Sequence, residues 1–191
     1  MSVRNVHEMP WIGEDLVFDL ANTVLCGGGP AGEDLDLLAD PPLLDAWRGR
    51  AADPRLAALS QPDLLTLRGP VRAALDAASR QAALPRAARE RLNELAAKAP
   101  VTFHIDTAGK LRQREQGGPV DGVTARRALV LAAGDEQVRL RRCPAPSCGM
   151  FFLARRKDQA WCSIGCGNRA RASRRPARGK PLAQSRTPAG T

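Results

Sequence analysis

The chain has 191 residues, enough for one domain of ordinary size with a small appendage. Hydrophobic residues make up 43% of it and tyrosine is absent, so the core must consist mostly of Leu, Ala and Val. No apolar run approaches the roughly 20 residues that span a bilayer, and the first residues lack the apolar stretch of a signal peptide. We therefore expect a cytoplasmic protein with no membrane partner.

The charge is distributed unevenly along the chain. Residues 139–191 carry 13 Lys and Arg against one acid, Asp158, for a net charge of +12, whereas residues 1–138 carry −3. A coding bias with a simply solvated surplus would explain Arg in place of Lys, but not the loss of acids from the last quarter alone. Such segregation is typical of a chain that binds a polyanion.

The first elements are predicted to be helices. Apolar side chains recur at helical spacing over residues 14–25, with a strand over residues 16–20 as the alternative. A flexible Gly-rich loop follows. The pair Asp40-Pro41 then starts a second helix, because Asp is a good N-cap residue and proline suits the first helical position.

Two more helices are predicted before residue 100. Apolar residues mark one face of a helix over residues 64–78. Pro70 lies inside this helix and should kink it or split it in two, because proline lacks the backbone N–H. Pro85 begins the next helix, in which Leu92 and Leu95 face inward.

The hydrophobic period changes after residue 100. Val101, Phe103 and Ile105 alternate with polar residues, and the sequence DTAGK that follows supplies a turn. We therefore predict a β-hairpin, with His104 facing solvent on the side opposite to the apolar residues.

The rest of the chain alternates between helix, strand and tail. A helical pattern over residues 123–133 stops at Gly134. Residues 138–142 and 150–154 have the composition of two short strands. The last residues, 179–191, are rich in Pro, Gly and small polar residues and are predicted to be disordered.

Four of the five cysteines form two close pairs. Their spacing is Cys143-x4-Cys148-x13-Cys162-x3-Cys166. This pattern is typical of a four-cysteine zinc site, in which each pair supplies two thiolates from one tight turn. Gly149 and Gly167 directly follow a cysteine, and a glycine with positive φ there would turn N–H groups toward the sulfurs.

Two disulfides, a redox switch or an iron–sulfur cluster would also use four cysteines. In a reducing compartment, clustered cysteines bind metal more often than they form structural disulfides, so we favour Zn²⁺. The set contains no His or carboxylate and implies no open coordination position, which argues for structural and against catalytic zinc. Cys26 lies far away in the Gly-rich loop and is expected to be an incidental thiol.

A basic helix is predicted to follow the second pair. Cys166 would occupy its first turn, where the positive end of the helix dipole suits a thiolate. At helical spacing the arginines that follow spread over more than one face and form a basic collar, which we expect to contact nucleic acid. The collar consists of Arg169, Arg171, Arg174 and Arg175.

These residues resemble the CGNR zinc finger, named for the four residues at positions 166–169. The sequence WCS at 161–163 is also typical of that family, and DLANT at 19–23 is similar to a motif of the ABATE-type domain that precedes such fingers. The resemblance implies a stress-induced transcription regulator whose C-terminal module binds zinc and DNA. Here the last cysteine pair has one intervening residue fewer than usual, which requires a tighter knuckle that Gly165 would permit.

Pattern and resemblance together predict an α+β protein in three parts. Residues 1–137 would form a mostly helical sensing or dimerising domain with a β-hairpin, and residues 138–178 a small treble-clef-like zinc finger followed by the tail, 179–191. The expected partners are DNA, a small-molecule effector and a second copy of the chain.

Polar residues interrupt the first predicted helix. Asp19, Asn22 and Thr23 would line an effector pocket; alternatively, Asn22 and Thr23 would hydrogen-bond locally or to the predicted hairpin and fix the fold. Neither His7 nor His104 has a Cys, Ser or Asp partner in the sequence. We therefore predict no nucleophile–base pair and no enzyme.

A second function stays open at this point. The finger would then be a module for protein or RNA interaction that zinc only holds together. Phe151, Phe152 and Trp161 would be stacking platforms for single-stranded RNA in that case, and otherwise the small hydrophobic core of the finger.

Overall fold

Helices and three small hairpins make up the part of the chain that the computed structural model describes, which is residues 9, 11–29 and 31–174. The α+β class predicted from the sequence is confirmed. In chain order the elements are α1 (Leu16–Ala21), β1 (Val24–Leu25), β2 (Leu35–Asp36), α2 (Pro41–Arg48), α3 (Pro54–Ala57), α4 (Gln61–Ser79), α5 (Arg86–Ala96), β3 (Val101–Ile105), β4 (Leu111–Glu115), α6 (Val120–Ala133), η2 (Asp135–Arg139), β5 (Leu140–Arg142), β6 (Phe151–Leu153) and α7 (Ile164–Ser173).

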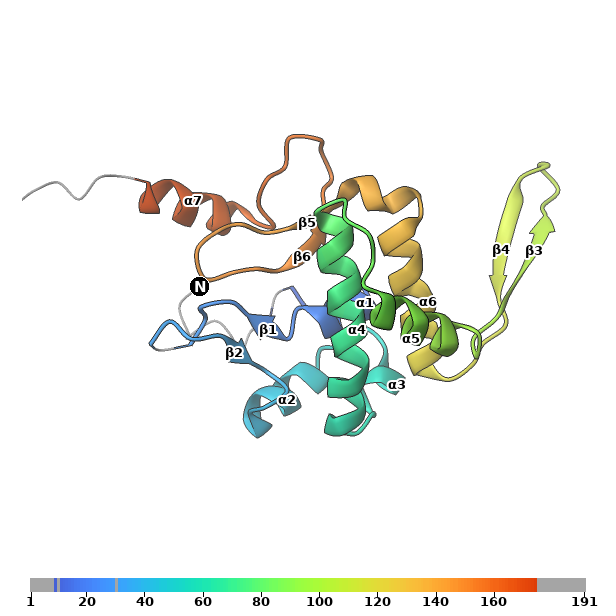
Figure 1. Cartoon of the computed structure of the whole chain (residues 1–191), viewed down its shortest axis with the longest axis horizontal. Helices are drawn as coiled ribbons and strands as arrows, with labels where there is room; N and C mark the ends of the chain where they lie inside the picture. Colours follow the sequence, from blue (N-terminus) through green and yellow to red (C-terminus); the bar gives the residue numbers. More distant parts are fainter. Residues whose placement is uncertain (1–8, 10, 30, 175–191) are drawn as a thin grey trace, which may run out of the picture.

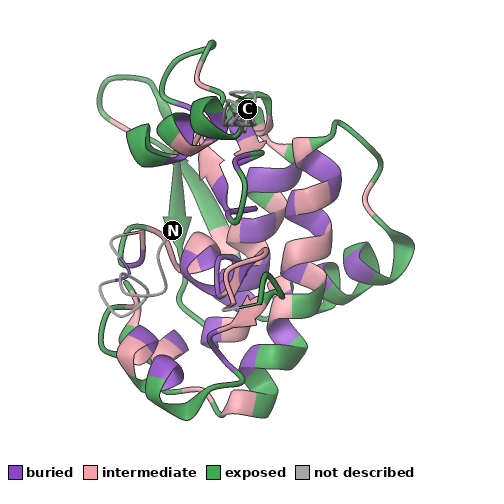
Figure 2. Ribbon diagram, turned by 90° about the vertical axis from the view of Figure 1, so that its left-hand side faces the viewer, coloured by how far each residue is buried: buried purple, intermediate pink, exposed green. Residues whose placement is uncertain are grey.

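The longest of these helices, α4, lies at the centre and contacts α1, α5 and α6 (Figure 1). Its apolar face is fully buried, while the exposed faces of the helices lie on the outside (Figure 2). The helix is continuous through Pro70, so the predicted split is wrong. Proline removes one hydrogen bond, to the carbonyl of Thr66, and that residue is exposed so that water can replace the bond.

The first helix is shorter than predicted. Asp15 caps α1 by accepting a hydrogen bond of 2.8 Å from the N–H of Val17, and the helix ends at Asn22. Val24 and Leu25 then form β1, which pairs with β2. A strand over residues 16–20 is therefore wrong, and so is the continuation of the helix to Leu25, because apolar residues at this spacing fit a helix and a short strand equally well.

The predicted hairpin forms as β3 and β4, an antiparallel pair in which Val101 lies opposite Glu115 and Ile105 opposite Leu111. His104 is exposed, as expected. The apolar face is exposed as well, because the hairpin projects away from the helices (Figure 1) and has no layer packed on it. The alternation of apolar and polar residues predicted both strands correctly, but it did not predict that the apolar face of the hairpin would be exposed.

One hydrophobic core serves both predicted domains. Leu140, Met150 and Phe151 of the finger belong to the same buried cluster as Leu20 and Val71. Strand β5 packs on α4, and β6 packs on α1. A boundary at residues 137 and 138 therefore stays a prediction, and the packing gives no sign of two separate cores within the described residues.

In the described part of the chain, every helix is too short or too polar to cross a membrane. The predicted tail at 179–191 lies outside the described residues, as does the end of the predicted finger from residue 175 onward.

Candidate metal centre and finger helix

The first cysteine pair lies in the loop that joins β5 to β6. The N–H of Cys143 donates to the carbonyl of Met150 over 2.8 Å and holds the two ends of the loop together. Gly149 has a φ of +71°, which is the left-handed conformation predicted for it. The backbone N–H groups of Ala145 and Met150 favour the thiolate forms of Cys143 and Cys148, respectively, and each acts to lower the pKa of that sulfur. The loop thus turns amide dipoles toward both sulfurs.

The second pair flanks the start of α7. Ser163 is the N-cap, and its hydroxyl accepts a hydrogen bond of 3.2 Å from the N–H of Cys166. Cys162 directly precedes the cap, and its Sγ lies 3.3 Å from that of Cys166. The short spacing between Cys162 and Cys166 therefore still brings the two sulfurs close together. Gly165 lies in the first helical turn without a positive φ, so the tight knuckle does not use its conformational freedom.

Gly167 has a different role from the predicted one. It lies inside α7, and its φ is not in the left-handed region. A Cβ at this position would meet the Cε3 atom of Trp161 at 3.3 Å. The glycine therefore makes room for the indole ring against the helix and does not shape a turn.

The four thiols converge on one point. The Sγ atoms of Cys143, Cys148, Cys162 and Cys166 all lie within 4.8 Å of one another. The Sγ of Cys148 is 3.6 Å from that of Cys162 and 3.7 Å from that of Cys166. A tetrahedron with Zn–S bonds of ~2.3 Å has sulfurs about 3.8 Å apart, so the set fits one tetrahedral ion.

The distances between the sulfurs also bear on the two alternatives to zinc, namely disulfides and an iron–sulfur cluster. All five cysteines are free thiols, so neither proposed disulfide is present. A cluster of several irons places sulfide between the metals and needs its thiolates farther apart than these four. Cys26 lies outside the group, as predicted; its sulfur accepts a hydrogen bond of 3.3 Å from Arg142.

Crowding of the sulfurs perturbs their titration. Hydrogen bonds from the Cys148 and Cys162 thiols lower the pKa of Cys143 to about 2. The same bond to Cys143 raises the pKa of Cys148 to about 12, and that of Cys162 is raised for the same reason. The group therefore favours one thiolate held by neighbouring thiols. A divalent cation would displace the remaining protons and bind four thiolates.

The arginines after the cysteines have different surroundings. Arg169 is half-buried and donates from Nη2 to the sulfur of Cys166 over 3.1 Å. Arg171 is exposed, donates to the Asn168 side chain over 2.6 Å, and lies with Cζ 5.9 Å from the centre of the Trp161 ring. Arg174 is exposed at the end of α7. The predicted collar is therefore not one uniform surface, because Arg169 contacts a sulfur of the cluster whereas Arg171 and Arg174 are exposed. Arg175 lies outside the described residues.

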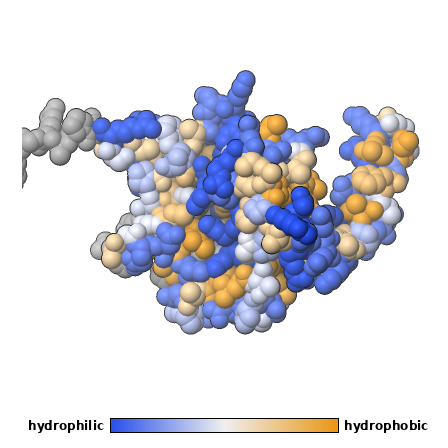
Figure 3. Space-filling model, viewed as in Figure 1, coloured by the Kyte–Doolittle hydropathy of each residue, from blue (hydrophilic) through white to orange (hydrophobic). Residues whose placement is uncertain are grey.

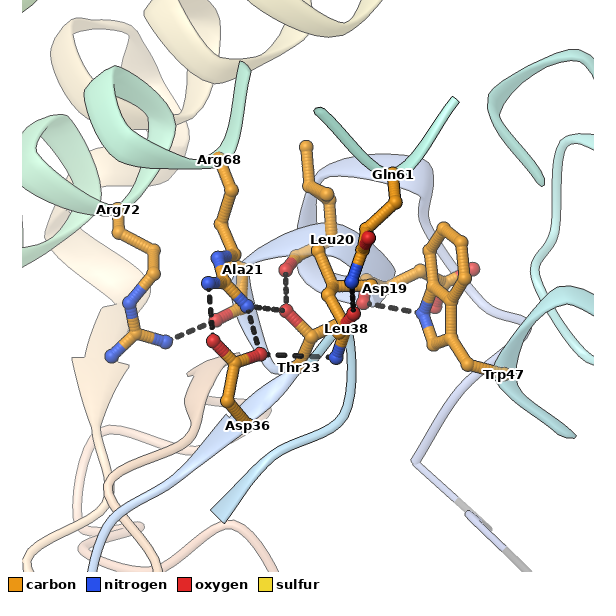
Figure 4. A network of polar contacts seen from close by, with 10 residues as sticks. All are labelled: Asp19, Leu20, Ala21, Thr23, Asp36, Leu38, Trp47, Gln61, Arg68 and Arg72. Carbon is orange, nitrogen blue, oxygen red and sulfur yellow. Dashed lines mark hydrogen bonds and ion pairs between the residues drawn. The ribbon is translucent and has the colours of Figure 1, made fainter. Parts of the chain in front are cut away.

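Asp19 and Thr23 belong to a polar network beneath α4 (Figure 4). The carboxylate of Asp19 is fully buried and accepts from the N–H of Gly13 over 2.8 Å and of Ala52 over 2.7 Å. Burial raises its pKa, and these two hydrogen bonds oppose that shift. The carboxylate thus ties the segment before α1 to the loop after α2.

Thr23 is also fully buried and fully bonded. Its hydroxyl donates to the carbonyl of Leu20 over 2.8 Å and accepts from Arg68 over 2.9 Å. Arg68 in turn pairs with Asp36 at 2.5 Å and 2.6 Å. The pKa of Asp36 is lowered, because these contacts with Arg68 outweigh its burial. Both Thr23 and Asp19 therefore have a structural explanation.

Asn22 joins the helices to the finger. Its Nδ2 donates to the carbonyl of Phe151 over 3.0 Å, and its Oδ1 accepts from the N–H of Phe151 over 2.8 Å. The side chain is only 3% exposed. The structural role considered from the sequence is thus present, but the partner is β6 of the finger and not the β3–β4 hairpin. No local pattern indicates a contact between residues 129 positions apart.

Two family models cover most of the chain. The ABATE model, described as "Putative stress-induced transcription regulator", matches residues 14–136. The chain belongs to the ABATE family. The CGNR zinc finger model matches residues 139–179, which contain all four clustered cysteines, so both parts of the predicted resemblance are confirmed. No curated protein matches the chain.

A cleft of about 950 Å³ lies between the ABATE region and the finger. Asn22 borders it, but Asp19 and Thr23 do not, so the predicted pocket is not formed by the three residues together. The indole nitrogen of Trp11, another lining residue, is buried without a hydrogen-bond partner among the described residues. The sequence did not indicate Trp11, because a lone aromatic in an irregular segment has no distinguishing pattern.

Proposed function

We propose that this ABATE protein is a DNA-binding transcription regulator whose finger is held in shape by one structural Zn²⁺. The observation that supports this proposal most is the position of α7. The helix begins at the sulfur cluster and carries the exposed side chains of Arg171 and Arg174. The segment around it, residues 139–191, has a net charge of +12. Such a surface suits the phosphates of duplex DNA.

The chemistry of the ligand set supports zinc. Four thiolates at tetrahedral separations are the ligands of a closed structural zinc site, which leaves no position for a substrate. The four sulfurs and Zn²⁺ together would carry a formal charge of −2. Arg169 donates to one of these sulfurs and offsets part of that charge. The metal would therefore hold the β5–β6 loop against the start of α7.

The cleft beside the finger is the site we assign to an effector. Its aromatic lining comes from Trp11 and Phe18 on the ABATE side and from Phe152 and Trp161 on the finger side. Arginines of the finger also border it, as do the carboxylates of Glu14, Asp15 and Asp158, so a planar aromatic molecule with polar groups at its edge suits the lining. A ligand held by both walls would change how the finger sits on the helices, and Asn22 lies at that junction.

Replacing Arg171 and Arg174 together by alanine should weaken binding of duplex DNA. If both meet phosphates, the log–log dependence of affinity on salt should flatten by about one to two units. Fluorescence anisotropy of a labelled duplex at several salt concentrations measures this. Arg169 is left unchanged, because its bond to Cys166 would confuse lost folding with lost binding.

The matched control is Arg89→Ala, which removes an exposed arginine from α5. It should leave the salt dependence unchanged. If the double variant keeps its zinc and binds with unaltered affinity and slope, α7 does not contact DNA. The alternative of a zinc-held interaction module would then be favoured.

A further inference from the structure

Three residues of α7 lie on one exposed face of the helix. Ile164, Asn168 and Arg171 follow one another at intervals of four and three residues, which places them in a line along a helix. All three are exposed, and Ile164 is 84% exposed although it is apolar. The buried side of α7 holds Cys166 and Ala170. The line, which we call the α7 stripe, therefore points away from the metal centre.

A series of contacts holds the Asn168 side chain in place. Arg171 donates from Nη2 to the Oδ1 of Asn168 over 2.6 Å, and its guanidinium lies over the Trp161 ring. The Nδ2 of Asn168 has no hydrogen-bond partner in the described part of the chain, and Oδ1 keeps a second lone pair. Asn168 does not border the effector cleft, whose lining includes Glu14 and Asp15. An oriented amide is thus free to bind a partner outside that cleft.

Positive charge surrounds the α7 stripe. The helix lies at an outer end of the molecule (Figure 1), and Figure 3 shows hydrophilic side chains along its C-terminal end, where Arg174 is exposed. In the loop before the helix, Arg155 and Lys157 are exposed and make no ion pair within the described residues. The single acid of this region, Asp158, contacts Arg156 at 3.5 Å. Basic groups on both sides of a helix suit the two phosphate backbones that border the major groove.

We propose that the α7 stripe reads base edges in the major groove of duplex DNA. This inference rests on the proposed function and adds sequence recognition to its phosphate contacts. An asparagine amide pairs with adenine, because its Nδ2 donates to N7 and its Oδ1 accepts from N6. An apolar side chain such as that of Ile164 contacts the methyl group of thymine. Arg171 stays at the phosphates and positions the amide of Asn168.

The geometry of α7 sets the distance between the two bases. Ile164 is the first residue of the helix, and N-terminal residues of a recognition helix are the ones that reach base edges. Asn168 follows four residues later, which is about 6 Å along the axis, whereas successive bases of one strand are about 3.4 Å apart. The thymine and the adenine should therefore lie within about two base pairs of each other. One exposed isoleucine needs no explanation by itself, but here it lies one turn from an oriented amide.

The same residues favour DNA over RNA. The major groove of an RNA duplex is too deep and narrow for side chains to read. Single-stranded RNA is bound by stacking on exposed aromatic rings. In the finger Phe151 is buried, Phe152 is half-buried, and the Trp161 ring is half-buried beneath Arg171.

Selection from a library of duplexes with a randomised centre, using the full zinc-loaded chain, tests the proposal. The wild type should enrich a motif with a thymine and an adenine at this spacing. Asn168→Ala should lose the preference for adenine, and Ile164→Ala the preference for thymine. On the duplex that the wild type enriches, Asn168→Ala should lower affinity by about 5–150-fold. The log–log slope with salt should not change, because no phosphate contact is removed.

Asn168→Asp gives a result that a merely structural role would not produce. A carboxylate only accepts hydrogen bonds, so the preference should change from adenine to cytosine, whose N4 donates. Ser173→Ala is the matched control, because it removes an exposed polar group about 140° around α7 from Asn168. It should leave the motif unchanged. Zinc content and far-UV circular dichroism verify that each variant is folded, and Ile164→Ala carries the test alone if the Asn168 variants are not.

A wild type that binds duplexes with the expected salt dependence but enriches no motif would overturn the reading of bases and leave the proposed function intact. So would a motif that either alanine variant leaves unchanged, or equal affinity for an RNA duplex of the enriched sequence. A wild type that binds no duplex would contradict the proposed function itself, and this inference with it.

Discussion

Cys148→Ser is expected to abolish metal binding. The Cys148 sulfur is buried and lies within 3.7 Å of two other ligand sulfurs. The serine hydroxyl is a poor ligand for a tetrahedral thiolate site, so only three thiolates would remain to bind the metal. Elemental analysis of the purified wild type should give about one zinc per chain, and of the variant close to none. The variant should also unfold at a lower temperature, because a module of this size depends on its metal.

The fifth cysteine provides the control. Cys26→Ser changes the same group of atoms at a thiol that lies outside the cluster, and it should keep its full complement of zinc. A wild type that holds less than about half an equivalent of zinc, or iron in its place, would contradict the assignment of the metal. A Cys148→Ser variant with unchanged zinc would contradict the assignment of the ligands.

Asn22→Ala is expected to destabilise the whole chain by about 2–4 kcal/mol, because it leaves both the N–H and the carbonyl of Phe151 buried without a partner. For a chain of this length each kcal/mol lowers Tm by about 2–4 °C, so a fall of about 5–15 °C should appear in thermal unfolding. The variant should still bind zinc, since Asn22 does not touch the sulfurs.

Asn93→Ala is the matched control. Asn93 is exposed on α5, so its loss should change stability by less than about 0.5 kcal/mol. An Asn22→Ala protein as stable as this control would show that the bonds to Phe151 do not hold the finger on the helices. A loss of zinc in the Asn22 variant would show instead that docking and metal binding are one event.

The metal centre was the part that the sequence predicted best, and the reason is local geometry. Each cysteine pair closes within a few residues, so its spacing alone determines whether two sulfurs meet. Helix starts were predicted for the same reason: Asp40 caps α2 through a bond of 3.1 Å to the N–H of Leu43. These contacts depend on neighbours in the chain and are visible in the sequence.

Contacts between distant segments could not be predicted in this way. Asn22 was recognised as unusual, but its partner Phe151 was not, because tertiary packing alone brings α1 beside β6. Alternating residues predicted the β3–β4 hairpin, but the pattern cannot say which layer covers its apolar face. Phe103 and Ile105 are exposed because no other element of the described chain packs on them. Alternation indicates a two-sided strand, and burial depends on the rest of the fold.

Binding of a labelled DNA duplex across a salt series, with zinc-loaded protein and with protein stripped of metal by a chelator, tests the proposed function most directly. The loaded protein should bind with a log–log slope of about −0.9 for each phosphate contact, because each contact releases counterions. The stripped protein should lose this binding, since α7 is held in place by the cysteines at its start. Equal affinity and slope with and without zinc, or no binding by the loaded protein, would contradict a zinc-dependent DNA-binding finger.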